Sequence, residues 1–259
     1  MARLPKNCWW LYCASLPNIA KIRHKDSMNV AFALPAVRPG APPVDFTLAR
    51  EQMVLNQIKP NNVIHPAVLA AVGEVPREIY VPSELQDRAY GDRLLSWGDG
   101  FLISPILCAW LLEYIVPFNL EHVLVLESGA GYISAIAAQV FPQVTALFPD
   151  VGPAKVALNN YAKSGYQNIT VKSGLLARGW SRSAPYQAVI MAGASAGIPD
   201  ALTEQLSNGA HMIGLLPDES NLLKLRLFIK LHGGVSGRTV ADGESPYLPG
   251  LAPLPQFRF

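Results

Sequence analysis

Hydrophobic and polar positions follow a regular helical order from about residue 45 onwards. Residues 45–58 place apolar side chains near one face of a helix, with Asp45 as its N-terminal cap. Pro66 opens a second predicted helix over residues 67–72, and Pro105 opens a third over residues 106–115. The third is apolar on almost every face, which predicts burial. This part of the chain is expected to be a helical addition to the region that follows.

From residue 122 onwards, short apolar runs alternate with segments of helical spacing. Residues 122–126 are rich in branched side chains, which is typical of a fully buried strand. Further strands are expected over residues 144–148, 169–172, 187–191, 211–216 and 225–231. Helices are expected between them over residues 133–140, 153–163 and 199–206. The alternation predicts one α/β, Rossmann-like domain over residues 44–232, with a mainly parallel sheet and helices on both faces.

The two ends of the chain lack this alternation. Residues 1–43 hold two basic clusters, a short apolar run and four prolines near their end, so we expect a flexible extension and linker. A secretory leader and a start site farther along, at Met28 or Met53, are the alternatives for this segment. Residues 233–259 carry five glycines and four prolines. They are predicted to form a tail that packs on the domain through Phe257 and Phe259.

Composition excludes several classes of protein. Half of the residues are hydrophobic and 15% are charged, which is enough to form a core. The net charge of +2 leaves no basic face for nucleic acid, and no apolar run reaches the roughly 18 residues that a membrane span needs. Cys8, Cys13 and Cys108 form neither a CxxC pair nor a disulfide framework, so we expect a reduced, cytoplasmic setting and no metal site.

A glycine-containing turn follows the first predicted strand. Ser128-Gly129-Ala130-Gly131 lead directly into a helix of small residues. In a parallel sheet, ligands bind beyond the carboxyl ends of the strands, and glycines let the backbone approach them. The same glycines also suit a tight strand-to-helix turn without a ligand, and the pattern alone does not decide between the two. A nicotinamide dehydrogenase is disfavoured, because no GxGxxG follows the strand.

Several stretches in the same order resemble protein-L-isoaspartate O-methyltransferases. The longest are MVLNQIKPNNV over residues 53–63, VPREIYVP over 75–82 and VLVLESGAGY over 123–132. The resemblance extends over roughly residues 45–230, and YLPG over 247–250 is similar to a divergent bacterial branch of the family. It implies a class I methyltransferase fold, S-adenosylmethionine as cofactor, and a protein or peptide substrate that is methylated on the carboxyl of isoaspartyl residues.

The resemblance also implies which residues hold the cofactor. The family loop usually reads Glu-Ile-Gly-Thr-Gly-Ser-Gly-Tyr, and the matching positions end in Tyr132. The implied cofactor residues are Glu127, Ser128, Gly129, Ala130, Gly131, Tyr132, Phe148 and Leu175. Four positions depart from the family: Val125 replaces an acid, Glu127 a glycine, Phe148 the ribose-binding acid, and Leu175 the adenine-reading Asp.

These departures leave two hypotheses open. A carboxylate on the ribose hydroxyls forms charge-assisted hydrogen bonds of about 1.5–3 kcal/mol each, so its loss weakens binding by roughly tenfold or more. Phe148 is also a candidate steric block, and Asp150 replaces the lost acid only if its loop is rearranged. The chain is therefore predicted to be a methyltransferase of the isoaspartyl type, with a catalytically inactive binding or scaffold protein as the alternative.

Ser104 is the catalytic candidate. The family carries a Ser in a Gly-His-Gly-Gln-Thr-Ile-Ser-Gln-Pro stretch, and residues 98–105 read GDGFLISP, one residue shorter before the proline. Alignment from the glycines places Ser104 at the catalytic position, whereas alignment from Pro105 places Ile103 there. A purely structural alternative is that Ser104 caps the helix after Pro105.

The remaining polar candidates are weaker. His65, His122 and His211 are scattered, and Cys108 lies in an apolar run, so structural roles are expected for all four. Trp97 is expected to pack in the core or to line a peptide groove.

Overall fold

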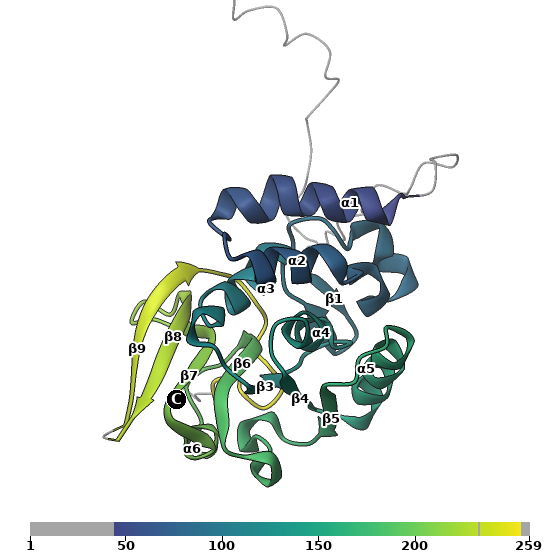
Figure 1. The fold of residues 1–259 in the computed structure, drawn as a ribbon. Coiled ribbons are helices and arrows are strands. Elements are labelled where there is room, and N and C mark those ends of the chain that lie inside the picture. Colours follow the sequence, from purple (N-terminus) through teal and green to yellow (C-terminus); the bar gives the residue numbers. More distant parts are fainter. Residues whose placement is uncertain (1–43, 233, 255–259) are drawn as a thin grey trace, which may run out of the picture. The chain divides into compact units, whose positions relative to one another are not determined.

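A mostly parallel seven-stranded sheet in the order β5-β4-β3-β6-β7-β8-β9 organises the chain (Figure 1). The structure is a computed structural model that describes residues 44–232 and 234–254. The strands are β3 (His122–Leu126), β4 (Gln143–Phe148), β5 (Ile169–Ser173), β6 (Tyr186–Ala194), β7 (Leu206–Pro217), β8 (Leu223–Leu231) and β9 (Gly234–Asp242). Strands β3 to β7 run parallel, while β8 and β9 are antiparallel to their neighbours.

Strand β3 lies at the centre of the parallel part. Its residue Val125 is paired with Ala146 of β4 on one side and Ile190 of β6 on the other, and all three are fully buried. The chain runs outwards from β3 to β4 and β5, and then returns to β6 on the opposite side of β3. At such a reversal the loops beyond the carboxyl ends of the strands diverge and leave a crevice for a ligand.

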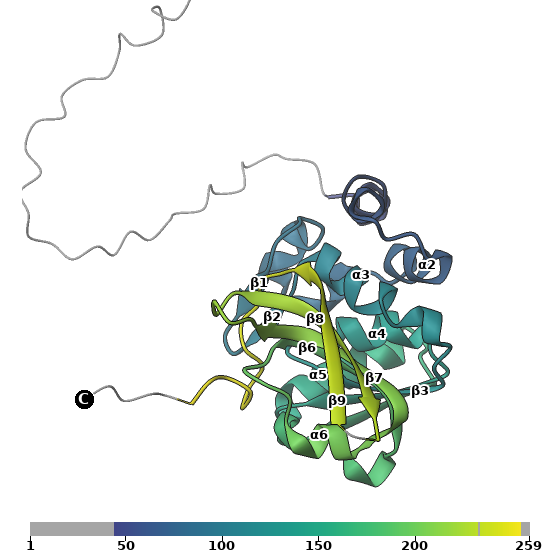
Figure 2. The ribbon, with the colours of Figure 1, turned by 90° about the vertical axis from the view of Figure 1, so that its left-hand side faces the viewer.

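Helices cover both faces of this sheet. Helix α4 (Tyr132–Ala138) joins β3 to β4, α5 (Val151–Lys163) joins β4 to β5, and α6 (Asp200–Glu204) joins β6 to β7. Parallel crossovers are right-handed, so connections that run in opposite directions along the sheet lie on opposite faces. In Figure 2, α3 and α4 accordingly lie on one side of the sheet and α6 on the other.

The helical N-terminal addition consists of α1 (Phe46–Met53), α2 (Pro66–Glu74) and α3 (Pro105–Glu113). Asp45 caps α1 by accepting hydrogen bonds from the backbone N–H groups of Thr47 and Leu48. Beyond α1 the helical path continues as a π-helical segment (Val54–Ile58) and a 3₁₀ turn (Lys59–Asn61). A proline is the first residue of both α2 and α3. An N–H at this position would have no acceptor within the helix, so its absence in proline costs no hydrogen bond.

The predicted strands and helices from residue 45 to residue 231 are all present, with small shifts at their ends. Three differences matter. The short hairpin of β1 (Leu95–Trp97) and β2 (Gly100–Leu102) was not predicted, and Leu206 begins strand β7 instead of ending a helix. Strand β9 was also not predicted, since residues 233–259 were assigned to a tail. It pairs with β8 along its whole length, so part of that segment belongs to the sheet.

Three sequence predictions lie outside the described residues: the extension over residues 1–43, the placement of Cys8 and Cys13, and the packing of Phe257 and Phe259. Within residues 44–232 and 234–254, no helix combines the length and the apolar character that crossing a membrane requires.

Candidate functional site

A cavity of about 680 Å³ lies beyond the carboxyl ends of β3 and β4. Its walls come from four separate segments of the chain. They are the β1–β2 hairpin, the loop after β3, the loop after β4 with the start of α5, and Pro249 in the C-terminal segment. The lining residues are Trp97, Gly98, Asp99, Gly100, Ser128, Gly129, Ala130, Pro149, Asp150, Pro153, Val156 and Pro249. The volume falls within the range of about 300–1,000 Å³ that is usual for ligand pockets.

The loop after β3 presents Ser128, Gly129 and Ala130 to the cavity. The β1–β2 hairpin packs directly on this loop. Phe101 N–H donates to the Ser128 carbonyl at 3.3 Å, and the Ser128 hydroxyl donates to the Phe101 carbonyl at 3.1 Å. A Cβ added to Gly129 would lie 2.6 Å from that same carbonyl and 3.2 Å from the Trp97 ring. Glycine is therefore required here by the protein's own packing as well as by access to the cavity.

Gly131 ends the loop and caps α4 with φ +94°. A Cβ at this position would lie 2.0 Å from the Tyr161 hydroxyl oxygen, and that hydroxyl donates to the Gly131 carbonyl at 2.8 Å. The next residue, Tyr132, is buried beneath the loop, with the Arg77 guanidinium 4.9 Å from its ring centre. Neither Gly131 nor Tyr132 lines the cavity. Both instead hold the conformation of the loop through contacts on its buried side.

Glu127 stands at the start of the same loop, and its side chain turns into the protein. It is 2% exposed, and Oε1 accepts hydrogen bonds from the Ser134 backbone N–H at 2.6 Å and from the Ser134 hydroxyl at 2.7 Å. The carboxylate thus caps the first turn of α4 from inside. Burial raises the pKa of this carboxyl to about 7, although both Ser134 hydrogen bonds act to lower it.

In the loop after β4, Asp150 and not Phe148 lines the cavity, which differs from the expectation from the sequence. Phe148 is 0% exposed and does not line the cavity, so it does not block the space that a ligand would occupy. Asp150 lines the cavity instead, two residues farther along. Its Oδ1 caps α5 by accepting from the Val151 N–H at 2.6 Å, and no other described residue bonds to the carboxylate, so it retains acceptor capacity.

Leu175 lies apart from this site. Its side chain is 63% exposed, and it precedes a 3₁₀ turn (Leu176–Arg178) outside the cavity lining. Of the eight residues implied for the cofactor, the structure therefore brings three to the cavity surface, buries four near it or beneath it, and leaves one on the molecular surface.

Ser104 lies at the N-terminus of α3 and not in the cavity lining. Its hydroxyl oxygen accepts a hydrogen bond from the Leu107 N–H at 3.3 Å, which is the capping geometry. The hydroxyl proton remains available, so its assignment as the catalytic residue stays a prediction.

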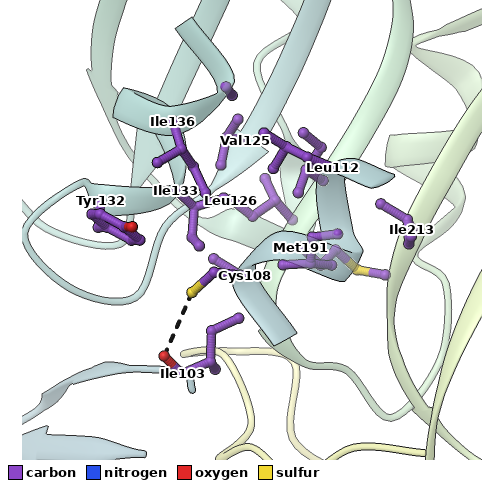
Figure 3. Packing of buried hydrophobic residues seen from close by; sticks show 14 of the residues in the cluster. Ile103, Cys108, Leu112, Val125, Leu126, Tyr132, Ile133, Ile136, Met191 and Ile213 are labelled. Atoms are coloured by element: carbon purple, nitrogen blue, oxygen red, sulfur yellow. Dashed lines mark hydrogen bonds between the residues drawn. The ribbon is translucent and has the colours of Figure 1, made fainter. Parts of the chain in front are cut away.

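The segment before Ser104 is held by Arg77, to which the sequence pattern assigned no role. The guanidinium is fully buried and donates to the carbonyl oxygens of Ala89 at 2.7 Å and Ile103 at 2.5 Å. It also donates to the Cys108 sulfur at 3.3 Å, while the Cys108 thiol lies 3.5 Å from the Ile103 carbonyl (Figure 3). Burial raises the pKa of the Cys108 thiol, which favours a packing role over a nucleophilic one. Arg77 thus joins the Ser104 segment, α3 and Tyr132.

The scattered histidines do not join this site. His65 caps α2, and His122 forms a hydrogen bond with Thr145. His211 stacks on Phe118, with the ring centres 3.6 Å apart. In the described part of the chain, no group of three His, Cys, Asp or Glu side chains is placed to hold a metal ion.

The sequence of this chain is similar to that of a known protein family. Residues 49–242 match the family described as protein-L-isoaspartate(D-aspartate) O-methyltransferase. The chain belongs to this family. The sequence prediction of an S-adenosylmethionine-dependent methyltransferase of the isoaspartyl type is thereby confirmed at the level of the family.

Two relatives in the protein-L-isoaspartate O-methyltransferase family show how far the likeness extends. The protein of that name from Synechococcus sp. is 34% identical over 197 residues, which cover 75% of this chain and 81% of the relative. The one from Picosynechococcus sp. is 38% identical over 171 residues, which cover 65% of this chain and 77% of the relative.

Solved structures confirm the class I methyltransferase fold. A protein-L-isoaspartate O-methyltransferase superposes with a TM-score of 0.67 at 22% identity, over 76% of this chain and 64% of that chain. One from Plasmodium falciparum, described as putative and in complex with S-adenosyl-L-homocysteine, gives a TM-score of 0.66 at 15% identity, over 80% of this chain and 99% of that chain. This chain therefore spans just under two thirds of the length of the first structure.

Most of the lining residues were not among the eight that the methyltransferase resemblance assigned to the cofactor, and they include Trp97, Asp99, Asp150 and Pro249. The sequence had suggested Asp150 as a replacement for the lost acid only if its loop was rearranged, and Trp97 as a residue of the core or of a peptide groove. Pro249 arrives through the C-terminal segment, in which Leu248 N–H donates to the Ala194 carbonyl at 2.8 Å and Ala194 N–H donates to the Pro246 carbonyl at 2.9 Å. Sequence spacing contains nothing that would predict this pairing, because it joins positions more than fifty residues apart.

Proposed function

We propose that the chain transfers a methyl group from S-adenosylmethionine to the side-chain carboxyl of isoaspartyl residues in proteins or peptides. The observation that carries the proposal is the cavity of about 680 Å³, whose floor is the glycine loop after β3. Family membership supports the same reaction. When bound, S-adenosylmethionine supplies an electrophilic methyl on a sulfonium, and the protein's task is mainly alignment.

The residues at the cavity fit this cofactor better than the sequence pattern suggested. Loop atoms of Ser128 to Ala130 line it, and Gly129 has no side chain to keep a ligand away. The open cavity does not contain Phe148, so the loss of the family acid there removes a contact without filling the space. Trp97 supplies an aromatic wall on the hairpin side.

Asp150 is the residue that we assign to the cofactor hydroxyls. Asp150 lines the cavity from the loop after β4, and the carboxylate oxygen that does not cap α5 accepts no hydrogen bond from a described residue. A carboxylate that accepts from hydroxyl groups contributes about 1.5–3 kcal/mol for each hydrogen bond. Asp150 would thus replace, from two residues farther along, the contact that Phe148 lacks.

Isothermal titration of the full chain with S-adenosylmethionine and S-adenosylhomocysteine tests the cofactor half of the proposal. We expect micromolar binding, which Asp150→Asn weakens by about tenfold, because Asn keeps the helix cap but loses the charge. Glu219→Gln, in the turn between β7 and β8, removes a charge away from the cavity and should bind like the wild type.

Transfer of labelled methyl groups to an isoaspartyl peptide, compared with the same peptide containing Asp, tests the substrate half. Absence of heat at millimolar ligand, from protein with native circular dichroism, would overturn the methyltransferase proposal and support the scaffold alternative. Binding without transfer would retain the cofactor and reject the isoaspartyl substrate. The cytoplasmic setting remains a prediction from cysteine usage.

A further inference from the structure

Glu127 carries a buried charge that the family loop does not have. The family pattern has a glycine at this position, so the carboxylate is a feature of this chain. It is 2% exposed and held by two hydrogen bonds from Ser134 in the first turn of α4. Gln would offer the same acceptor oxygen at this place, so capping α4 does not by itself require a charge.

No cation of the described residues forms an ion pair with this carboxylate. Within residues 44–232 and 234–254 the ion pairs are Arg88 with Asp87 and Lys224 with Asp242, and neither includes Glu127. The ionisable groups around it are the phenols of Tyr80 and Tyr161 and the thiol of Cys108, all with pKa values that burial raises, so they are neutral at pH 7. The nearest described cation in this cluster is Arg77, which bonds to Cys108 and lies over the Tyr132 ring. An ionised Glu127 therefore keeps a negative potential around it.

The residues that directly follow Glu127 in the chain form part of the cavity wall. The three residues that follow Glu127, namely Ser128, Gly129 and Ala130, line the cavity wall, whereas Glu127 lies behind it. Glu127 and the adjoining Ser128 are both buried, and charges in a protein interior interact far more strongly than they do across water. Its effect on a ligand therefore does not require direct contact.

The proposed cofactor and its product differ in the charge on the sulfur atom. S-adenosylmethionine carries a cationic sulfonium, while S-adenosylhomocysteine has a neutral thioether, and the rest of the two molecules is the same. We propose that Glu127 is a specificity-determining residue of the cavity, whose buried carboxylate favours binding of the sulfonium over the thioether. This inference rests on the proposed function, and it adds that the chain discriminates against its own product.

Titration calorimetry of the full chain and of Glu127→Gln at pH 8 tests the inference. The quantity of interest is the ratio of the Kd for S-adenosylhomocysteine to the Kd for S-adenosylmethionine. We expect Glu127→Gln to lower this ratio by about three- to tenfold, since it removes the charge and keeps the acceptor oxygen. Glu219→Gln is the matched control, because it makes the same substitution in the turn between β7 and β8, away from the cavity, and its ratio should stay near that of the wild type.

A second measurement requires no substitution. At pH 5.5, where the buried carboxyl is protonated, the wild-type ratio should fall towards that of Glu127→Gln, and the ratio of the variant should not change with pH. A ratio that is the same in the wild type and the variant, or one independent of pH in the wild type, would overturn this inference while both ligands still bind. Failure of both ligands to bind the folded wild type would instead overturn the proposed function, and this inference with it.

Discussion

The loops after β3 and β4 both depart from the family pattern, and they do so in opposite ways. After β3 a side chain was added, and Glu127 turns inwards to cap α4 while the backbone of the next three residues still lines the cavity. After β4 an acid was lost, and Phe148 turns inwards into the core while Asp150 faces the cavity two residues later. In both loops the substituted position points away from the ligand space. A departure at an aligned position therefore does not imply a blocked or empty site.

Restoring the family acid at Phe148 should have the largest effect of the tests below. Because this side chain is fully buried, Phe148→Asp would both open a void and bury an unpaired carboxylate. We expect a loss of at least about 4 kcal/mol in the free energy of unfolding, measured by urea denaturation. Phe148→Leu, which keeps an apolar side chain, should cost clearly less. If Phe148→Asp were as stable as the wild type and bound S-adenosylmethionine more tightly, this side chain would face the cavity, and the contrast between the loops would be lost.

Gly131→Ala tests how tightly the loop after β3 is packed against the protein interior. The added methyl meets the Tyr161 hydroxyl at a residue whose φ is +94°. Overpacking and strain together predict a destabilisation of about 3–4 kcal/mol and a corresponding fall in melting temperature. Gly152→Ala is the control, because nothing lies within 4 Å of a Cβ there and its φ is not positive. Equal melting temperatures for the two variants would show that the loop is free to move away from Tyr161.

The pH dependence of stability reports on Glu127. Burial raises the pKa of its carboxyl from an ordinary value of 4.5 to about 7 in the folded protein. Between these values the folded state binds a proton that the unfolded state has released, so stability falls as pH rises from 4.5 to 7. The loss amounts to about 3 kcal/mol, at roughly 1.4 kcal/mol per pKa unit. Denaturant titrations across this window should show that Glu127→Gln lacks this component of the pH dependence, whereas an unchanged slope would mean that Glu127 titrates normally.

Ser104 provides the test with the smallest effect on stability. If it acts only as the cap of α3, Ser104→Ala should lose about 1 kcal/mol of stability, while Ser104→Asp keeps the cap and the stability. Methyl transfer to an isoaspartyl peptide then separates the two roles. If the cap is its only role, Ser104→Asp should retain transfer, since Ser104 does not line the cavity. Loss of transfer in a stable Ser104→Asp would establish the catalytic assignment.

Most of the parallel sheet was predictable from the sequence, and the reason is local. Strand β3 is a run of buried branched residues, and the neighbouring helices α2 and α3 each begin with a proline. The β1–β2 hairpin and strand β9 gave no such pattern. The hairpin strands have three residues each, and β9 is an edge strand with mixed exposure on both faces and two glycines, Gly234 and Gly237. Strands β1 and β2 pair with each other and are held by hydrogen bonds between Phe101 and Ser128 in the loop after β3, while β9 pairs with β8, the strand directly before it.

The sequence alone determined the family, the parallel sheet and the location of the glycine loop, since these depend on residue order, periodicity and motif spacing. Only the tertiary structure decided which side chains face the cavity. Glu127 and Phe148 turn inwards because Ser134 and the core offer them partners there, and Asp150 turns outwards because it caps α5 at the cavity rim. The structure also decided that Trp97 and Pro249 complete the walls. Side-chain direction and contacts between distant segments are set by packing across the whole domain, and no spacing along the chain records them.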